Sequence, residues 1–270
     1  MSSLPATTEL GVELADHVAT VEIRRPPHNF FDLGLIRALA EAFEALDAEP
    51  ACRAIVLAAQ GKSFCAGANF GDGAALDADG QAKALPAGAA HRGVHLYVEA
   101  VRLFRTAKPI VGAIHGPAVG GGLGLALVPD FRVACPEARF CANFTRLGFH
   151  PGFGLTVTLP ELVGRREAAL MFYTSRRLKG EDALRIGLAD VLVPLAEVRA
   201  AAQTLAREIA ECSPLGVVAT RATLRRGLAD RVREATEHEL AEQTRLRRTE
   251  DFREGVKAMA ERRTPRFVGR

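Results

Sequence analysis

The sequence predicts an α/β fold followed by a helical C-terminal part. Apolar runs typical of buried strands, such as 54–58 and 110–114, alternate with segments whose apolar residues recur at helical spacing. After Pro194 the chain becomes charged and rich in helix-forming residues. Strands that alternate with helices are typical of a sheet covered by helices. We therefore expect a sheet-based core at 1–200 and a helical region at 201–270.

The first expected elements are a strand, a helix and a second strand. Val18, Val21 and Ile23 predict a strand over 18–23, which the turn-forming residues 24–29 end. Leucine and phenylalanine recur at helical spacing across 35–46, with acidic residues on the other faces. The apolar run 54–58 predicts a buried strand. Residues 71–90 are rich in Gly, Ala and Asp and predict a loop.

The same alternation continues along the chain. A strand at 110–114 runs into a glycine turn, a helix at 123–128 and a further strand at 131–134. Two charged helices are expected in the C-terminal region, at 199–211 and 222–248. These elements give the sheet its helical cover and the C-terminal region its helical character.

Composition places the chain among globular proteins without nucleic-acid partners. Its 270 residues are 48% hydrophobic and 25% charged, and the net charge of +3 comes mostly from the last fifty residues. Glutamates are interspersed among those arginines, so solvated helix faces explain the charge better than an RNA-binding arm. Five cysteines without a CxxC pair and an N-terminus without a secretory signal predict a reduced, cytoplasmic protein.

One segment imitates a membrane span. Residues 110–128 hold no Asp, Glu, Lys or Arg and are long enough to cross a bilayer. The segment also contains His115, Pro117 and six glycines, which form a poor membrane helix. We therefore expect a strand, a turn and a buried helix here, and no membrane partner.

The glycine-rich segment 114–124 (IHGPAVGGGLG) is the sharpest local motif. Glycines let a backbone approach a ligand closely, and the first N–H groups of a helix have no partner within the helix. No Gly-Lys-Ser/Thr follows, as a phosphate-binding P-loop requires, and no GxGxxG fits a dinucleotide site. Taken alone, the motif fits an anion-binding loop and a purely structural turn equally well.

A second small-residue loop, 61–69, completes a wider pattern. Its residues 64–68 (FCAGA), together with 108–110 (KPI), the glycine turn and Asp130, resemble the enoyl-CoA hydratase/isomerase family, also called crotonases. The resemblance spans residues 12 to 267. Further matching blocks in the same order are 138–140, 147–148, 151–154, 162–164, 183–191 and 251–255.

This resemblance implies a crotonase-like spiral of ββα units and an acyl-CoA substrate. It also implies a helical C-terminal region that makes homotrimers or dimers of trimers, with no cofactor beyond the coenzyme A of the substrate. The two backbone N–H groups that hold the thioester oxygen carry over to Ala68 and Gly121. Losing one such donor typically costs about 3–4 kcal/mol of transition-state stabilisation. The neighbouring substrate-binding positions are Ala66, Gly67, Asn69, Gly120 and Thr145.

The sequence departs from the family pattern where its hydratases carry two glutamates. Gly124 and Phe144 stand at those positions, and neither side chain transfers a proton. The aspartate nucleophile of related dehalogenases would fall near Gly152. We therefore expect isomerase, decarboxylase, or C–C or thioester-cleaving activity, with non-catalytic acyl-CoA binding as the alternative. Phe144, Phe149 and Phe153 predict an apolar site, for a bulky acyl group or as space-filling residues.

Three histidines are candidates for catalytic or metal-binding chemistry. His150 is the best candidate acid or base, because imidazole is a common general acid and base and the family places this stretch at the acyl pocket. A hydrogen-bonded histidine in a turn is the alternative. His91 and His95, four residues apart, fit one face of a helix, but no third ligand is evident. We therefore expect no metal site.

Overall fold

The computed structural model describes residues 7–69 and 95–270. A six-stranded sheet has the strand order β1-β2-β3-β4-β6-β9, and a three-stranded sheet has the order β5-β7-β8. Neighbouring strands are parallel except for the pairs β1–β2 and β7–β8. The strands are β1 (Leu10–Ala15), β2 (Val18–Ile23), β3 (Ala54–Ala59), β4 (Ile110–Ile114), β5 (Pro117–Val119), β6 (Phe131–Ala134), β7 (Arg139–Cys141), β8 (Arg177–Lys179) and β9 (Val191–Leu192).

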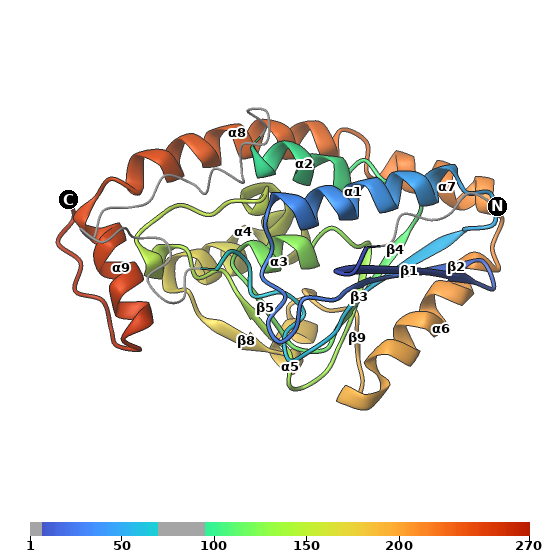
Figure 1. The fold of residues 1–270 in the computed structure, drawn as a ribbon, viewed down its shortest axis with the longest axis horizontal. Coiled ribbons are helices and arrows are strands. Elements are labelled where there is room, and N and C mark those ends of the chain that lie inside the picture. The colour runs from blue at the N-terminus through green and yellow to red at the C-terminus, as the bar shows by residue number, and fades with distance from the viewer. Residues whose placement is uncertain (1–6, 70–94) are drawn as a thin grey trace.

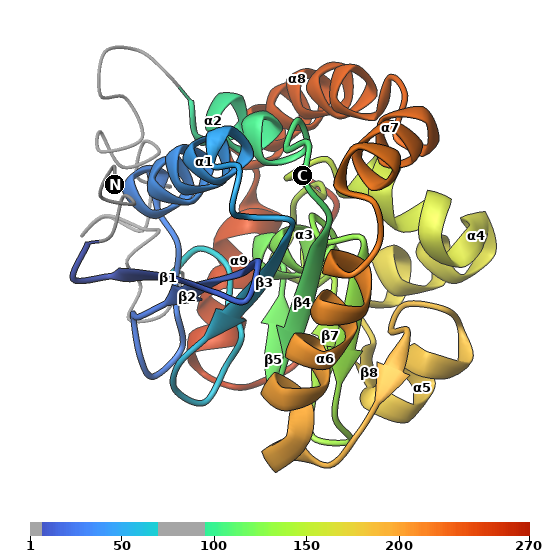
Figure 2. The same ribbon diagram turned by 90° about the vertical axis from the view of Figure 1, so that its right-hand side faces the viewer.

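Helices cover the large sheet on both sides, so its inner strands are buried on both faces. Helix α6 (Val198–Ala210) packs against β2, β3, β4 and β6, while α1 (Leu33–Ala48) packs against β1, β2 and α2 (Leu96–Leu103) (Figures 1 and 2). Every residue of β3 and β4 is buried. Parallel strands covered on two faces bury both sets of side chains, which explains the continuous apolar runs in the sequence.

Two helices near the C-terminus pack against earlier parts of the chain. Helix α8 (Leu228–Leu246) packs against α2 and α4 (Leu155–Thr174), and α9 (Glu250–Ala260) packs against the short turn Thr145–Leu147 (Figure 1). The C-terminal helices therefore return to the core. The other helices are α3 (Gly121–Ala126), α5 (Gly180–Arg185) and α7 (Pro214–Leu224).

The structure confirms the expected strands at 18–23, 54–58, 110–114 and 131–134. The helix expected across 35–46 is α1, which begins at Leu33 behind the N-cap Asp32; the carboxylate of Asp32 accepts the Leu35 N–H at 2.9 Å. The first strand, β1, was not anticipated. Its residues 10–15 pair with β2 at the sheet edge and are partly exposed, so they lack a strong apolar signal.

The expectation of one helix over 222–248 is wrong. Helix α7 ends at Leu224 and α8 begins at Leu228, because Gly227 between them has a φ of +73° and interrupts the helix. The expected division at residue 200 falls inside α6, which packs on the sheet. The predicted loop 71–90 and His91 lie outside the described residues.

Within the described ranges, no helix is both long and apolar enough to span a membrane. The segment 110–128, which imitates a span in composition, forms β4, β5 and α3. Its apolar character follows from burial in the core rather than from contact with lipid.

Candidate active site

Two loops from different parts of the chain meet beside the small sheet. Cys65 on the loop after β3 forms a parallel bridge with Ala118 of β5. The Cys65 N–H donates to Pro117 O at 3.1 Å, and the Val119 N–H donates to Cys65 O at 3.0 Å. The two loops predicted to carry the oxyanion donors are thus joined by backbone hydrogen bonds, and their relative position is fixed.

Glycines make this close approach possible. A Cβ atom on Gly67 would lie 2.6 Å from Val119 O and 3.3 Å from Gly121 N. A Cβ atom on Gly122 would overlap the carbonyl oxygen of Cys65. Gly67 also has a φ of +79°, which only glycine adopts without strain. The contact between the loops therefore requires glycine at both 67 and 122.

The two predicted donors are chain neighbours of the glycines in this contact: Ala68 follows Gly67, and Gly121 precedes Gly122. Ala68 is exposed on the first loop, and Gly121 is the first residue of α3. Within the described parts of the chain, neither of these two N–H groups donates to a protein acceptor. An oxygen that develops negative charge gains two charge-assisted hydrogen bonds in such a place. The arrangement is suited to polarising a carbonyl group.

Aromatic carbon fills both positions at which the resemblance places the glutamates of the family's hydratases. A Cβ atom on Gly124 would lie 2.7 Å from Cδ1 of Phe153, so the Phe153 ring already occupies that space. Phe144 is buried and packs edge-on against Phe149 with ring centroids 5.5 Å apart. Its Cζ atom lies 3.9 Å from the Cβ position of Gly120. Neither position offers a group that transfers a proton.

His150 lies in the turn before α4 and faces α8. Its Nδ1 is 2.8 Å from Pro151 O, and its ring packs edge-on to His238 with centroids 5.8 Å apart. Because a carbonyl oxygen only accepts, the hydrogen of the neutral ring belongs on Nδ1. Nε2 is then the atom left to accept a proton.

The other predicted binding residues belong to the same two loops or to the turn below them. The Ala66 N–H donates to His28 O at 3.0 Å, and Asn69 is exposed at the end of the described part of the first loop. The Thr145 hydroxyl donates to Phe172 O at 2.6 Å and lies 2.9 Å from Ser175 Oγ. This hydroxyl therefore holds the turn to the end of α4.

A buried polar network on α8 was not anticipated from the sequence. The Tyr97 hydroxyl donates to Gln243 Oε1 at 3.0 Å, and Gln243 Nε2 donates to His150 O at 2.9 Å. Burial raises the pKa of Tyr97 well above its usual range, and nearby Glu239 adds to this effect. The hydroxyl is therefore a fixed hydrogen-bonding group at neutral pH.

Glu239, fully buried on the same helix, holds the start of α4. Its carboxylate accepts from Gly154 N at 2.8 Å and from both the backbone N–H and the hydroxyl of Thr156. Burial raises the pKa of Glu239, although these hydrogen bonds act against the rise. The signal in the sequence was the spacing of Thr236, Glu239 and Gln243, which places polar residues on the buried face of α8.

One of the two histidines considered as metal ligands, His95, caps a helix instead. His95 is the N-cap of α2, where its Nδ1 accepts the Tyr97 N–H at 3.1 Å, and His91 is outside the described residues. In the ranges 7–69 and 95–270, no three His, Cys, Asp or Glu side chains are grouped closely enough to hold a metal ion.

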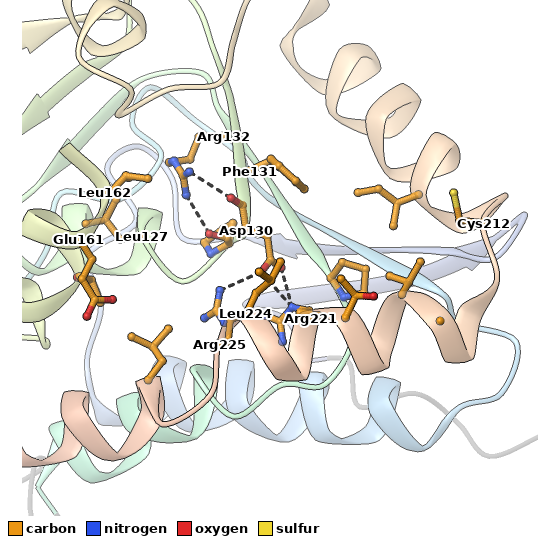
Figure 3. A pocket seen from close by; sticks show the side chains of 18 of the residues that line it. Leu127, Asp130, Phe131, Arg132, Glu161, Leu162, Cys212, Arg221, Leu224 and Arg225 are labelled. Atoms are coloured by element: carbon orange, nitrogen blue, oxygen red, sulfur yellow. Dashed lines mark hydrogen bonds and ion pairs between the residues drawn. The ribbon is translucent and has the colours of Figure 1, made fainter. Parts of the chain in front are cut away.

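A cavity of about 730 Å³ lies away from the donor loops, between α4, α6, α7 and β6 (Figure 3). None of the predicted site residues lines it. In its lining, the Asp130 carboxylate forms ion pairs with Arg221 and Arg225, drawn as dashed lines in Figure 3. The oxygen–nitrogen distances are 2.9 Å to Arg221 Nε and 3.0 Å to Arg225 Nη1. Asp130, which belonged to the family resemblance, therefore fastens α7 to the sheet.

Comparisons with known proteins identify the family of this chain. The family model described as Enoyl-CoA hydratase/isomerase matches residues 13–270. A putative enoyl-CoA hydratase of Thermus thermophilus is 34% identical over 260 residues, covering 93% of this chain and 97% of the relative. A crotonyl-CoA hydratase of Syntrophomonas wolfei is 30% identical over 261 residues, covering 96% and 97%.

A solved structure shares the fold of this chain. The crystal structure of an enoyl-CoA hydratase/isomerase from Pseudoalteromonas atlantica superposes with a TM-score of 0.83 at 27% identity, covering 96% of this chain and 100% of that one. The similarity includes both sheets and the C-terminal helices.

Proposed function

The chain belongs to the enoyl-CoA hydratase/isomerase family, and we propose that it binds an acyl-CoA thioester through the N–H groups of Ala68 and Gly121. The observation that carries this proposal is the junction of the two loops, which leaves both N–H groups without a protein acceptor in the described residues. A thioester oxygen placed between them accepts from two directions.

Polarisation of the carbonyl makes the neighbouring carbon acidic and its bonds easier to break. When a proton or a carbon substituent leaves that carbon, negative charge moves onto the thioester oxygen. Fixed N–H donors stabilise this charge without reorganising, and each typically contributes about 3–4 kcal/mol. Backbone donors are independent of pH, so a partner side chain would set the pH dependence of the reaction.

The reaction we propose is isomerisation, decarboxylation, or cleavage of a C–C or thioester bond. Gly124 and Phe144 offer no group for water activation, and the rings of Phe153 and Phe144 fill the space around them. His150, with Nε2 as the accepting atom, is the proposed acid or base. The remaining substrate contacts are assigned to Ala66, Gly67, Asn69, Gly120 and Thr145, and no cofactor beyond coenzyme A takes part.

A non-catalytic acyl-CoA-binding role is the second candidate. The same burial of Phe144 and Phe153 favours it, because a site filled with aromatic carbon retains the oxyanion donors for affinity alone. Under this alternative, acyl-CoA binds and no product forms.

Incubation with a panel of acyl-CoA thioesters, followed by mass spectrometry of the products, separates these possibilities. Isothermal titration of the same panel gives the affinities. We expect thioesters to bind more tightly than free coenzyme A and at least one to be converted. Binding without conversion would establish the second candidate, and efficient hydration of crotonyl-CoA would overturn our interpretation of Gly124 and Phe144.

We also propose that the protein is located in the cytoplasm. All five cysteines are free thiols, and four of them are buried. Free thiols are typical of reducing compartments, which supports a cytoplasmic location.

A further inference from the structure

Phe153 has an unusual backbone conformation beside the donor loops. Its φ is +65°, a region that non-glycine residues seldom occupy, and its side chain is only 1% exposed. Strained conformations of this kind persist only where the surroundings enforce them, and they concentrate at functional sites. The conformation directs the ring onto α3, where Cδ1 and Cβ lie 2.7 and 2.8 Å from the Cβ position of Gly124.

Hydrogen bonds from two other helices hold this turn in place. The Tyr97 hydroxyl of α2 donates to Gln243 of α8, and the Gln243 side-chain amide donates to His150 O at the start of the turn. Further along the turn, Gly154 donates its N–H to the buried carboxylate of Glu239. The ring position is therefore fixed by packing and by hydrogen bonds that do not involve the ring.

Phe31 continues the aromatic surface towards the donors. Its N–H donates to Gly67 O at 3.0 Å, and a Cβ atom on Gly121 would overlap the tip of its ring. The rings of Phe31 and Phe153 lie with centroids 5.5 Å apart at an interplanar angle of 39°. Gly121 and Gly124, three residues apart on α3, lie on one face of the helix, and each is covered by one ring of this aromatic pair.

We propose that Phe31 and Phe153 are specificity-determining residues that restrict the site to thioesters with an acyl group unbranched next to the carbonyl. This inference rests on the proposed thioester site. A carbonyl oxygen bound by the Gly121 N–H places the adjoining acyl carbon beside the aromatic pair. A branch at that carbon, or a side chain at residue 124, competes with the rings for the same space.

The test compares the affinities of butyryl-CoA and isobutyryl-CoA, which differ only in the branch. Wild type, Phe153→Leu and Phe153→Gly are titrated calorimetrically, with Phe131→Ala as the control for loss of a phenylalanine remote from the donors. Phe131 is 39% exposed and lines the cavity of Figure 3. Circular dichroism and melting curves show which variants are folded.

We expect wild type to prefer butyryl-CoA by about 10-fold or more, the scale at which a pocket discriminates one methyl group. Shortening Phe153 should reduce this preference at least about 5-fold by tightening isobutyryl-CoA binding. Phe131→Ala should leave the preference unchanged. A folded Phe153 variant with the wild-type preference would overturn the inference while leaving the thioester site intact. Wild-type protein that binds neither thioester would overturn the proposed function itself.

A second pair of variants tests the space between Phe153 and α3 by adding a methyl group at Gly124. Gly124→Ala should weaken butyryl-CoA binding because its Cβ meets Cβ of Phe153, an atom that no side-chain rotation removes. Gly124→Ala combined with Phe153→Gly should recover at least about 5-fold of the lost affinity, since glycine also accepts the φ of +65°. No recovery in the folded double variant would contradict the proposed competition.

Discussion

At the scale of single residues, the site depends on positions that have no side chain. Gly67 and Gly122 allow the two loops to touch, and their contact sets the spacing of the Ala68 and Gly121 N–H groups. Substituting a donor residue leaves its N–H in place, so the geometry has to be tested through the glycines between the donors. This makes steric variants more informative than removal of a functional group.

We predict that Gly122→Ala weakens acyl-CoA binding and, for a thioester that is converted, lowers turnover about 100-fold or more, the usual effect of losing one oxyanion donor. The added methyl overlaps Cys65 O, so the loops must separate. Gly216→Ala is the matched control, because the atom nearest its Cβ position is Ser213 Oγ at 3.4 Å. Titration with one thioester measures both variants. Unchanged affinity in Gly122→Ala would show that the loop contact does not set the site.

His95 gives a prediction about pH. Burial lowers the pKa of His95, and Arg247 lowers it further by a smaller amount. Between the pKa of the folded state and that of the unfolded state, His95 is therefore protonated in the unfolded chain and neutral in the folded chain. Its contribution to stability is present above pH 6.5, the unfolded value, and is lost as the pH falls below it. Protonation also ends the acceptance of the Tyr97 N–H.

The measurement is urea unfolding at pH 7.5 and 5.5 for wild type and His95→Asn, which keeps an N-cap acceptor but does not titrate. Wild type should lose more free energy of unfolding than the variant, by up to about 1.4 kcal/mol per pH unit. Equal losses in the two proteins would exclude His95 as the cause.

At the scale of elements, the ion cluster around Asp130 attaches the C-terminal helices to the sheet. Asp130 accepts Ile110 N at 2.8 Å as well as the guanidinium groups of Arg221 and Arg225. Arg221 also donates to Thr106 O. The cluster thus joins β4, the turn before β6 and the last turn of α7.

We predict that Asp130→Asn lowers the free energy of unfolding by about 3–5 kcal/mol, the usual effect of leaving a buried ion pair without one partner. The control is Glu161→Gln, which breaks the pair with Arg231. Both side chains of that pair are 48% exposed, and its loss should cost less than about 1 kcal/mol. Chemical denaturation measures both values. Similar small losses would show that the Asp130 cluster contributes no more than a surface pair.

The elements also show how far sequence reasoning extends. The continuous apolar runs of β3 and β4 and the helical spacing in α1 are direct consequences of burial, so they were predictable. The edge strand β1 and the break at Gly227 depend on pairing and on one backbone angle, which periodicity does not report. The oxyanion positions come from the resemblance and stay a prediction. The Phe153 turn depends on Tyr97, Gln243 and Glu239, which come from distant elements, so the sequence gives no local signal for it.

At the scale of the whole molecule, we propose a homotrimer or a dimer of trimers, with the helical region 201–270 supplying subunit contacts. Leu215 and Leu224 on α7 are 83% and 81% exposed in the single chain. Leu224 also lines the large cavity of Figure 3, and exposed apolar side chains beside such a hollow are typical of an interface.

The double variant Leu215→Glu/Leu224→Glu should therefore shift the assembly towards a species of the chain mass, 28.9 kDa. Light scattering after size exclusion measures this mass. Tyr173→Glu, at a residue that is 80% exposed but outside 201–270, should leave the wild-type mass unchanged. An unchanged mass in the leucine variant would remove α7 from the proposed interface.

The most direct test of the central claim is the carbonyl carbon signal of a bound acyl-CoA labelled with ¹³C at the thioester carbon. Donation from both Ala68 and Gly121 withdraws electrons from that carbon, so we predict a clear downfield shift on binding to wild type and a smaller shift on binding to Gly122→Ala. A labelled thioester that binds with the same carbonyl shift as in free solution would contradict the assignment of these two N–H groups as the oxyanion donors.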